Sequence, residues 1–240
     1  VEALSTGAAI RDPRIDAVVL ALPPQLHAEF ALAAIAAGKH VLVEKPIALT
    51  PDDAIRVVEA GKRAGVTVMT GHVLRFHPAF EALAEMVAAG ALGKLQYVHS
   101  HRVGLGKFHT ENDALWDIAP HDLSLILALT GEEPEDIRGE GSAVLNHLSD
   151  FAHLHLAFPS GIRSHVFASR LNPYRERKLT VIGEKAMAVF DDVAPWHEKL
   201  AVNDQQDRNN HPGMQYKTSE TRFVDVPEFQ PLSQQSQQYI

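Results

Sequence analysis

Three short apolar runs, separated by two helix-like segments, constrain the fold of this chain more than any other feature. The runs are RIDAVVLAL over residues 14–22, HVLVEKP over residues 40–46 and VTVMT over residues 66–70. Their shortness and their content of valine, isoleucine and threonine favour strands over buried helices. Strands alternating with helices through joints this short predict a parallel sheet with right-handed crossovers.

Proline, threonine and glycine residues set the limits of the two helices. A proline pair ends the first strand and opens a helix over residues 24–37, which Gly38 closes. Thr50 has the character of an N-cap for a second helix over residues 51–64, and Gly65 ends it. Proline at the start and glycine just past the end of a helix is the usual asymmetry.

The middle strand carries the first residues with chemical potential. We expect it to be buried on both faces and to stop at Pro46, which cannot donate a hydrogen bond to a sheet. Lys45 is thereby placed at the carboxyl edge of a parallel sheet, where such sheets bind ligands. An ammonium group there can stabilise an alkoxide as hydride leaves its carbon. An ordinary surface ion pair at a strand end is an equally open interpretation.

After Gly71 the pattern changes from alternating strands and helices to successive strands. Amphipathic helices are expected over residues 78–89 and 117–129. Strands are expected from Leu95 onward, and over residues 151–158, 161–169, 178–182 and 186–190. Alternating polarity in these strands predicts a sheet with one packed and one polar face. The fold class is therefore α/β plus α+β, with a domain over residues 1–71 and a second over residues 72–240.

Asp117 and His121 form the second group with chemical potential. They are four residues apart, so they share one face of the predicted helix. Pro120 is tolerated only in the first turn of a helix, which places both residues near its N-terminus. A carboxylate there can orient an imidazole that takes a proton from a hydroxyl group. Alternatively, Asp117 is a simple N-cap and His121 a core histidine.

Paired histidines raise the possibility of a metal site and of a metal-dependent hydrolase. The pairs are His72 with His77, His99 with His101, and His153 with His155. The chain has no cysteine and no His-Glu-x-x-His helix, so solvated strand positions explain these histidines better. We expect no bound metal.

Composition excludes several classes of function. The chain has 240 residues, a net charge of −8 and no basic stripe, which argues against a nucleic-acid partner. No apolar run is long enough to cross a membrane, and no signal peptide is recognisable. Zero cysteines is compatible with the cytoplasm. The first residue is valine and the last segment is polar, so we expect both ends to be cut.

Two segments of the sequence resemble the glucose–fructose oxidoreductase / inositol dehydrogenase / MocA (Gfo/Idh/MocA) family. They are ALPPxxH over residues 21–27 and AAGKHVLVEKP over residues 36–46, with the later Asp-x-x-x-His. The resemblance implies a partial Rossmann-type domain and a catalytic group of Lys45, Asp117 and His121. It implies NAD as cofactor, with NADP not excluded. The implied cofactor-binding residues are Leu22, Pro23, Pro24, His27, Glu44, Lys45, Pro46 and Arg75.

A narrower likeness is to the UDP-N-acetylglucosamine or UDP-N-acetylglucosaminuronate 3-dehydrogenase branch. It is carried by residues 75–78, 100–123 and 186–192. It implies oxidation of a sugar 3-hydroxyl to a keto sugar. The candidate substrate-binding residues are Lys45, Lys107, Trp116, His121, Arg170 and Asn172. A dehydrogenase of a free sugar or inositol, and a non-catalytic binding or regulatory protein on the same scaffold, remain alternatives.

The family's glycine-rich phosphate loop and its ribose-binding acidic residue have no counterpart in this sequence. We therefore expect residues 1–70 to match only the second part of a nucleotide-binding domain, so NAD binding by this piece alone stays an open question. The last helix and strand of the family also have no counterpart. The sheet of the second domain has a polar open face, on which one strand places Arg163, His165 and Phe167. This face predicts dimers or tetramers that associate sheet to sheet.

Overall fold

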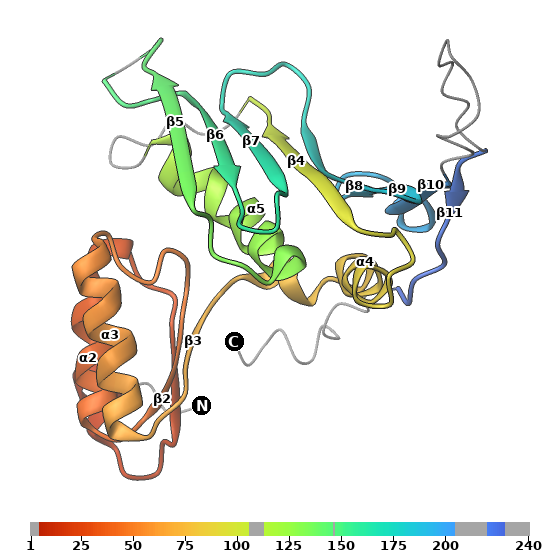
Figure 1. Cartoon of the computed structure of the whole chain (residues 1–240). Helices are drawn as coiled ribbons and strands as arrows, with labels where there is room; N and C mark the ends of the chain where they lie inside the picture. The colour runs from red at the N-terminus through yellow and green to blue at the C-terminus, as the bar shows by residue number, and fades with distance from the viewer. Residues whose placement is uncertain (1–4, 106–112, 146, 205–219, 229–240) are drawn as a thin grey trace. The chain divides into compact units, whose positions relative to one another are not determined.

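The computed structural model describes residues 5–105, 113–145, 147–204 and 220–228 (Figure 1). The chain divides into two compact units, the first ending at His72 and the second beginning at Val73. Each unit has its own hydrophobic core. Among the described residues, no helix has the length and apolar character needed to span a membrane.

The first unit is a parallel sheet with helical crossovers, as the sequence predicts. Its sheet has the order β1-β2-β3, and Val19, Leu42 and Met69 are neighbours across it. Its elements are α1 (Thr6–Arg11), β1 (Ala17–Leu20), the 3₁₀-helix η1 (Pro24–Leu26), α2 (His27–Ala36), β2 (His40–Val43), α3 (Pro51–Ala64) and β3 (Val68–Thr70).

The predicted limits of α3 are confirmed in detail. The backbone N–H of Asp53 donates to the Thr50 hydroxyl at 3.2 Å, and Gly65 ends the helix with φ of 68°. The first strand is shorter than the run of residues 14–22 that predicts it, and the following helix begins with a 3₁₀ turn.

The two faces of the parallel sheet differ. Leu20, Val41 and Val43 pack into the core of this unit together with Val57 of α3. Val19 on the opposite face is 68% exposed. The expectation that these strands are buried on both faces is therefore wrong for the described residues, because helices α2 and α3 cover only one of them (Figure 1).

The second unit is a mostly antiparallel sheet of eight described strands, in the order β11-β10-β9-β8-β4-β7-β6-β5. Every neighbouring pair is antiparallel except β4 with β7. This confirms the predicted fold class. Its strands are β4 (Leu95–Val103), β5 (Asp136–Ser142), β6 (Phe151–Ala157), β7 (Arg163–Ser169), β8 (Glu176–Gly183), β9 (Ala186–Asp191), β10 (Leu200–Asp204) and β11 (Arg222–Phe223).

The helices of this unit are η2 (Val73–Phe76), α4 (Pro78–Ala88), α5 (Ala114–Thr130) and η3 (Trp196–Glu198). Helix α5 lies against the sheet beside β4, β6 and β7 (Figure 1). Leu125 and Ile126 of α5 are fully buried there with Val98 and Val166. Alternate residues of the same strands face away from α5 and form what we call the open face of the sheet.

Helix α5 corrects one prediction. It begins at Ala114, three residues earlier than expected, because Asp113 caps it by accepting a hydrogen bond from Trp116 N–H at 2.8 Å. Pro120 therefore lies inside the helix and not in its first turn. The prediction that Asp117 and His121 lie near the N-terminal end still holds, since Asp117 is in the first turn.

Candidate active site

The carboxyl edge of the parallel sheet collects most of the residues expected to bind a cofactor. Strand β1 leads into Leu22, Pro23 and Pro24, and β2 leads into Glu44, Lys45 and Pro46. Because β1 and β2 are parallel and in register, both loops leave the sheet at the same edge. Lys45 is half-buried there.

His27 ties these two loops together. Its side chain is buried, with 1% of the residue exposed, and both ring nitrogens lie against backbone carbonyls. Nδ1 is 2.7 Å from the carbonyl oxygen of Pro46, and Nε2 is 2.8 Å from that of Leu22. The resemblance to the family predicts that His27 contacts the cofactor. Both polar atoms of its ring instead contact backbone carbonyls, so His27 supports the two loops at the carboxyl edge of the sheet.

Gly71 packs closely against Glu44 at this edge of the sheet. A Cβ added to Gly71, just after β3, would lie 2.9 Å from Oε2 of Glu44 and 3.4 Å from its Cα. Gly71 N–H donates to Val43 O at 2.8 Å, which holds the two strand ends together. A sheet edge formed by the loops of Pro23, Pro24 and Lys45 fits a dinucleotide, which in open α/β sheets binds outside the carboxyl ends of strands.

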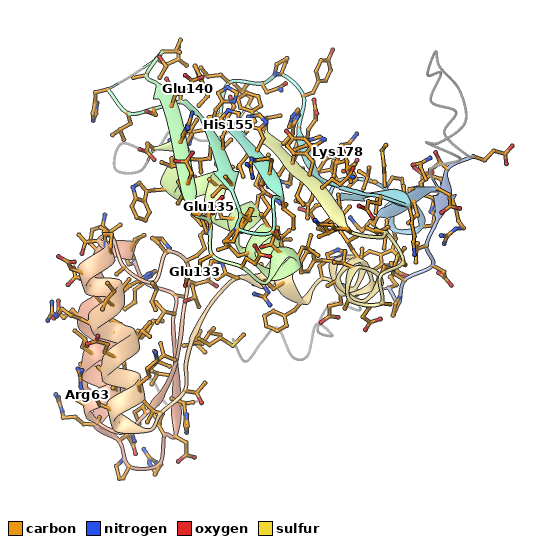
Figure 2. All side chains as sticks on the ribbon, in the orientation of Figure 1. Arg63, Glu133, Glu135, Glu140, His155 and Lys178 are labelled. Carbon is orange, nitrogen blue, oxygen red and sulfur yellow. The ribbon has the colours of Figure 1, made fainter. Side chains whose placement is uncertain are left out.

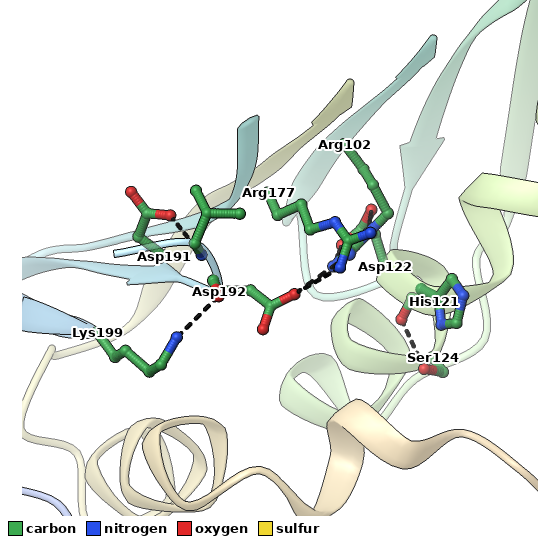
Figure 3. Close-up of polar contacts among 9 residues, drawn as sticks. Arg102, His121, Asp122, Ser124, Arg177, Asp191, Asp192 and Lys199 are labelled. Atoms are coloured by element: carbon green, nitrogen blue, oxygen red, sulfur yellow. Dashed lines mark hydrogen bonds and ion pairs between the residues drawn. The ribbon is translucent and has the colours of Figure 1, made fainter. Parts of the chain in front are cut away.

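The second group of predicted residues lies on α5. Asp117 in its first turn and His121 one turn later share a side of the helix, and both are partly exposed. Nη2 of Arg170 lies 3.2 Å from Oδ2 of Asp117. Ser124 Oγ donates to the backbone carbonyl of His121 at 2.7 Å, a contact seen in Figure 3. A carboxylate and an imidazole so placed are suited to moving a proton.

A buried ion pair anchors α5 next to His121. Arg102 of β4 donates to both carboxylate oxygens of Asp122, at 2.9 and 3.0 Å, and both side chains are nearly inaccessible (Figure 3). Burial raises the pKa of Asp122, and the charge of Arg102 opposes that rise. Asp192, which follows β9, joins the group through Arg177 at 3.3 Å. The sequence gives no sign of this pair, which fixes the rotation of α5 against the sheet.

The predicted substrate ligands have different surroundings. Trp116 is 43% exposed on α5, and Arg75 is exposed on η2. Asn172 accepts a hydrogen bond from Tyr174 N–H at 3.0 Å and so shapes its own turn. Arg170 is 2% exposed and contacts Asp117. Lys107 lies outside the described residues.

The paired histidines are not arranged as a metal centre in the parts of the chain that the structure describes, which hold no group of three His, Asp or Glu side chains able to bind a metal ion. His99, His101, His153, His155 and His165 instead lie on the open face of the sheet. Nδ1 of His153 and Nε2 of His165 are 3.1 Å apart. His77 is separate from these, and caps α4 by accepting from Ala79 N–H at 3.1 Å.

A parallel nucleotide-binding type of sheet followed by an open-faced antiparallel sheet defines a class of two-domain oxidoreductases. Residues 3–72 match the family model described as "Oxidoreductase family, NAD-binding Rossmann fold". Residues 80–189 match the model described as "GFO/IDH/MocA C-terminal domain". The chain belongs to the GFO/IDH/MocA family.

Two curated relatives show the range of this similarity. A UDP-N-acetylglucosamine 3-dehydrogenase of Acidithiobacillus ferrooxidans is 29% identical over 178 residues, which is 74% of this chain and 56% of the relative. A myo-inositol 2-dehydrogenase of Thermotoga maritima is 30% identical over 199 residues, which is 77% of this chain and 59% of the relative. The chain thus spans less than two thirds of the length of either relative.

Solved structures have the same fold. The UDP-N-acetylglucosamine 3-dehydrogenase GnnA of Acidithiobacillus ferrooxidans matches with a TM-score of 0.79 and 26% identity, over 94% of this chain and 69% of that one. An oxidoreductase of Magnetospirillum magnetotacticum matches with a TM-score of 0.80 and 31% identity, over 98% of this chain and 74% of that one.

Proposed function

We propose that this chain serves an NAD-dependent oxidoreductase that oxidises a secondary hydroxyl of a sugar nucleotide to a ketone. The substrate we favour is a UDP-N-acetylhexosamine or its uronate, oxidised at the 3-hydroxyl. The observation that carries the proposal is the pairing of two features in a member of this family. Lys45 leaves β2 at the carboxyl edge of a parallel sheet, and Asp117 and His121 share one side of α5.

Each of the three residues has a role suited to its chemistry. His121 takes the proton of the reacting hydroxyl, and Asp117 orients its ring. Lys45 donates a hydrogen bond to the same oxygen and stabilises the negative charge that develops there. NAD, when bound, supplies the hydride acceptor. The loops at Leu22–Pro24 and Glu44–Pro46 would hold the nicotinamide half of that cofactor.

The substrate assignment rests on similarity to the Acidithiobacillus enzyme, which is named for UDP-N-acetylglucosamine. The Thermotoga relative, which is named for myo-inositol, has similar identity and supports a second candidate, a polyol or free-sugar dehydrogenase. Exposed Trp116 on α5 favours the sugar nucleotide, because an aromatic face can stack on a sugar or a uracil ring. Lys107 and Asn172 remain proposed ligands of the sugar or its diphosphate.

The test is NADH formation by the protein produced from its complete gene, with UDP-sugars and inositols as substrates. Lys45→Ala and His121→Asn should each lower kcat by about 100-fold or more, the size expected for loss of an acid–base or oxyanion group. Lys62→Ala on α3 and His197→Asn are matched controls, since both residues are exposed. Turnover within a few-fold of wild type in both site variants would refute the roles. No turnover of any substrate would favour a non-catalytic binding protein.

We also propose that two copies associate through the open face, giving a homodimer or a tetramer. This face presents the acidic Asp136 and Glu140 on β5 and the basic Lys178 on β8, so it offers charges of both signs to a copy of itself. Figure 2 labels Glu140 and Lys178, together with His155 of the same face. Light scattering tests this: a monomer at micromolar concentration would refute it. Zero cysteines is in keeping with a cytoplasmic location.

A further inference from the structure

Arg170 occupies an unusual place beside the N-terminus of α5. It follows β7 directly, and its side chain is 2% exposed. One terminal nitrogen, Nη2, lies 3.1 Å from the backbone carbonyl of Asp113 and 3.2 Å from Oδ2 of Asp117. Asp113 is the N-cap of α5, so a single guanidinium reaches both the cap residue and the carboxylate one turn further on.

The backbone around Arg170 is held by its neighbours. Its own N–H donates to the carbonyl of Asp150 at 2.9 Å. Asp150 is 1% exposed, and its Oδ2 accepts from the N–H groups of Val144 and Leu145 at 2.8 and 2.7 Å. Arg170 thus starts from a fixed point and has little freedom to swing toward solvent. A side chain so buried and so directed is poorly placed to bind a sugar or a diphosphate.

The geometry points to Arg170 as a positioning residue for Asp117 and His121, an inference that rests on the proposed function and deepens it. The guanidinium holds the Asp117 carboxylate in one orientation on α5. It also offsets the negative charge of that carboxylate, which would otherwise favour the protonated form of the neighbouring imidazole. Arg170 does this without contacting the substrate.

Charge sets the direction of the effect. A lone carboxylate beside a histidine favours the imidazolium form, and a cation paired with that carboxylate weakens the preference. Among the described residues, the charged or titratable groups on α5 and on the segments around it include Asp113, Asp122, Arg102, Asp150, Arg75 and His77. Asp192 and Arg177 lie beside the pair of Arg102 and Asp122. Arg102 and Asp122 neutralise one another. The histidines of β4, β6 and β7 lie across the sheet, on the open face.

The decisive experiment is steady-state kinetics of Arg170→Met in the protein from the complete gene. We expect kcat to fall about 10- to 100-fold, with KM changed less than about threefold, because alignment and not binding is lost. We expect the acidic limb of the pH profile of kcat/KM to move upward by roughly half a unit, since His121 then holds its proton more strongly. A raised KM with unchanged kcat would make Arg170 a substrate ligand and overturn the inference.

Arg102→Lys is the matched control, because Arg102 also makes a buried ion pair with α5. It should lower the melting temperature without moving the acidic limb. Equal shifts in both variants would mean a structural role only. If Arg170→Met does not fold, Arg170→Lys decides: it should lower kcat with KM unchanged, because a lysine cannot contact both Asp113 and Asp117 as the guanidinium does.

A measurement without turnover separates this inference from the proposed function. The NMR titration of His121 in the 240-residue chain, assigned with His121→Asn, should move to higher pH in Arg170→Met. That shift supports the Arg170 link even if His121→Asn leaves turnover unchanged and the proposed function fails. An unmoved titration overturns the inference even if Lys45 and His121 prove essential.

Discussion

Nδ1 of His27 lies 2.7 Å from the carbonyl oxygen of Pro46, although the two residues belong to different loops of the nucleotide-binding type of sheet. The other ring nitrogen faces the carbonyl of Leu22 at 2.8 Å. The ring therefore bridges the two loops, with one polar atom against each carbonyl. The position of Lys45, next to Pro46, therefore depends on a buried histidine.

Replacing His27 should destabilise the first unit. His27→Phe removes both ring nitrogens and leaves two carbonyls facing an apolar ring. We expect a loss of about 2–4 kcal/mol, on the basis of about 1–3 kcal/mol for each buried polar group left without a partner. Urea denaturation followed by circular dichroism measures the loss. His197→Phe, at an exposed position, should change the unfolding free energy by less than about 0.5 kcal/mol. An equally small change in His27→Phe would show that His27 does not hold the two loops together.

The buried pair of Arg102 and Asp122 leads to a second stability prediction. Asp122→Asn removes the nearer carboxylate of Arg102 and leaves Asp192, whose Oδ2 is 3.7 Å from Nη1 of Arg102. The loss should be about 3 kcal/mol, the lower end for a broken buried pair. Asp136→Asn is the matched control, because Asp136 makes a pair with Arg138 in which both side chains are at least half exposed. Such a surface pair contributes about 1 kcal/mol or less. Thermal unfolding of both variants provides the comparison, and similar losses would show that burial is not what makes the first pair important.

The histidines of the open face predict a pH dependence. Burial, followed by the charges of His155, His153, His101 and His99, lowers the pKa of His165 to about 4 from the usual 6.5. The unfolded chain therefore binds more protons at this residue between these two values, so stability should fall as the pH is lowered through 6.5 toward 4. Above pH 6.5 this residue contributes no slope.

Melting temperatures recorded from pH 7.5 to 4.5 test this dependence. His165→Gln should flatten the fall in stability on the acidic side, whereas His197→Gln, at an exposed site, should leave it unchanged. An identical pH profile in His165→Gln and the wild type would show that His165 is not the group responsible. The same titration would weaken any association through the open face in acid, because added protons place like charges across the interface.

Residues close together in the sequence predict much of this fold. The features that depend on polar contacts between distant residues are not predicted. Thr50 and Gly65 mark the ends of α3 because capping depends on residues a few positions apart. The sequence misplaces the start of α5 because proline is usually confined to the first turn of a helix, whereas Pro120 lies inside α5 and Asp113 caps it. The 3.6-residue spacing of the helix is unaffected by that error, so Asp117 and His121 were still placed on one side of it.

The candidate site shows the same division. Lys45 and His27 belong to segments that resemble the family, so sequence placed them near a cofactor, but only the structure shows that the ring of His27 is turned toward protein carbonyls. Arg170 sits after an alternating strand, where a charged residue reads as exposed. The sequence around Arg170 does not indicate its contact with Asp117, which lies 53 positions earlier in the chain. Strand β5 has glycines at two of its seven positions and lacks the apolar run that is typical of a strand, so the sequence does not predict it.

Gly71 provides the last prediction, which concerns cofactor binding. A methyl group there would lie 2.9 Å from Oε2 and 3.2 Å from Cδ of Glu44, so the carboxylate must move from the edge where we propose NAD binds. Gly71→Ala should therefore weaken NAD binding by about tenfold, which is about 1.4 kcal/mol, while the second unit stays folded. Gly7→Ala, in α1, adds a methyl group that meets only the end of Arg11 at 3.4 Å, and should leave NAD binding unchanged. Fluorescence titration of the protein from the complete gene measures both dissociation constants. Equal affinity in Gly71→Ala and the wild type would show that the cofactor does not depend on this edge of the sheet.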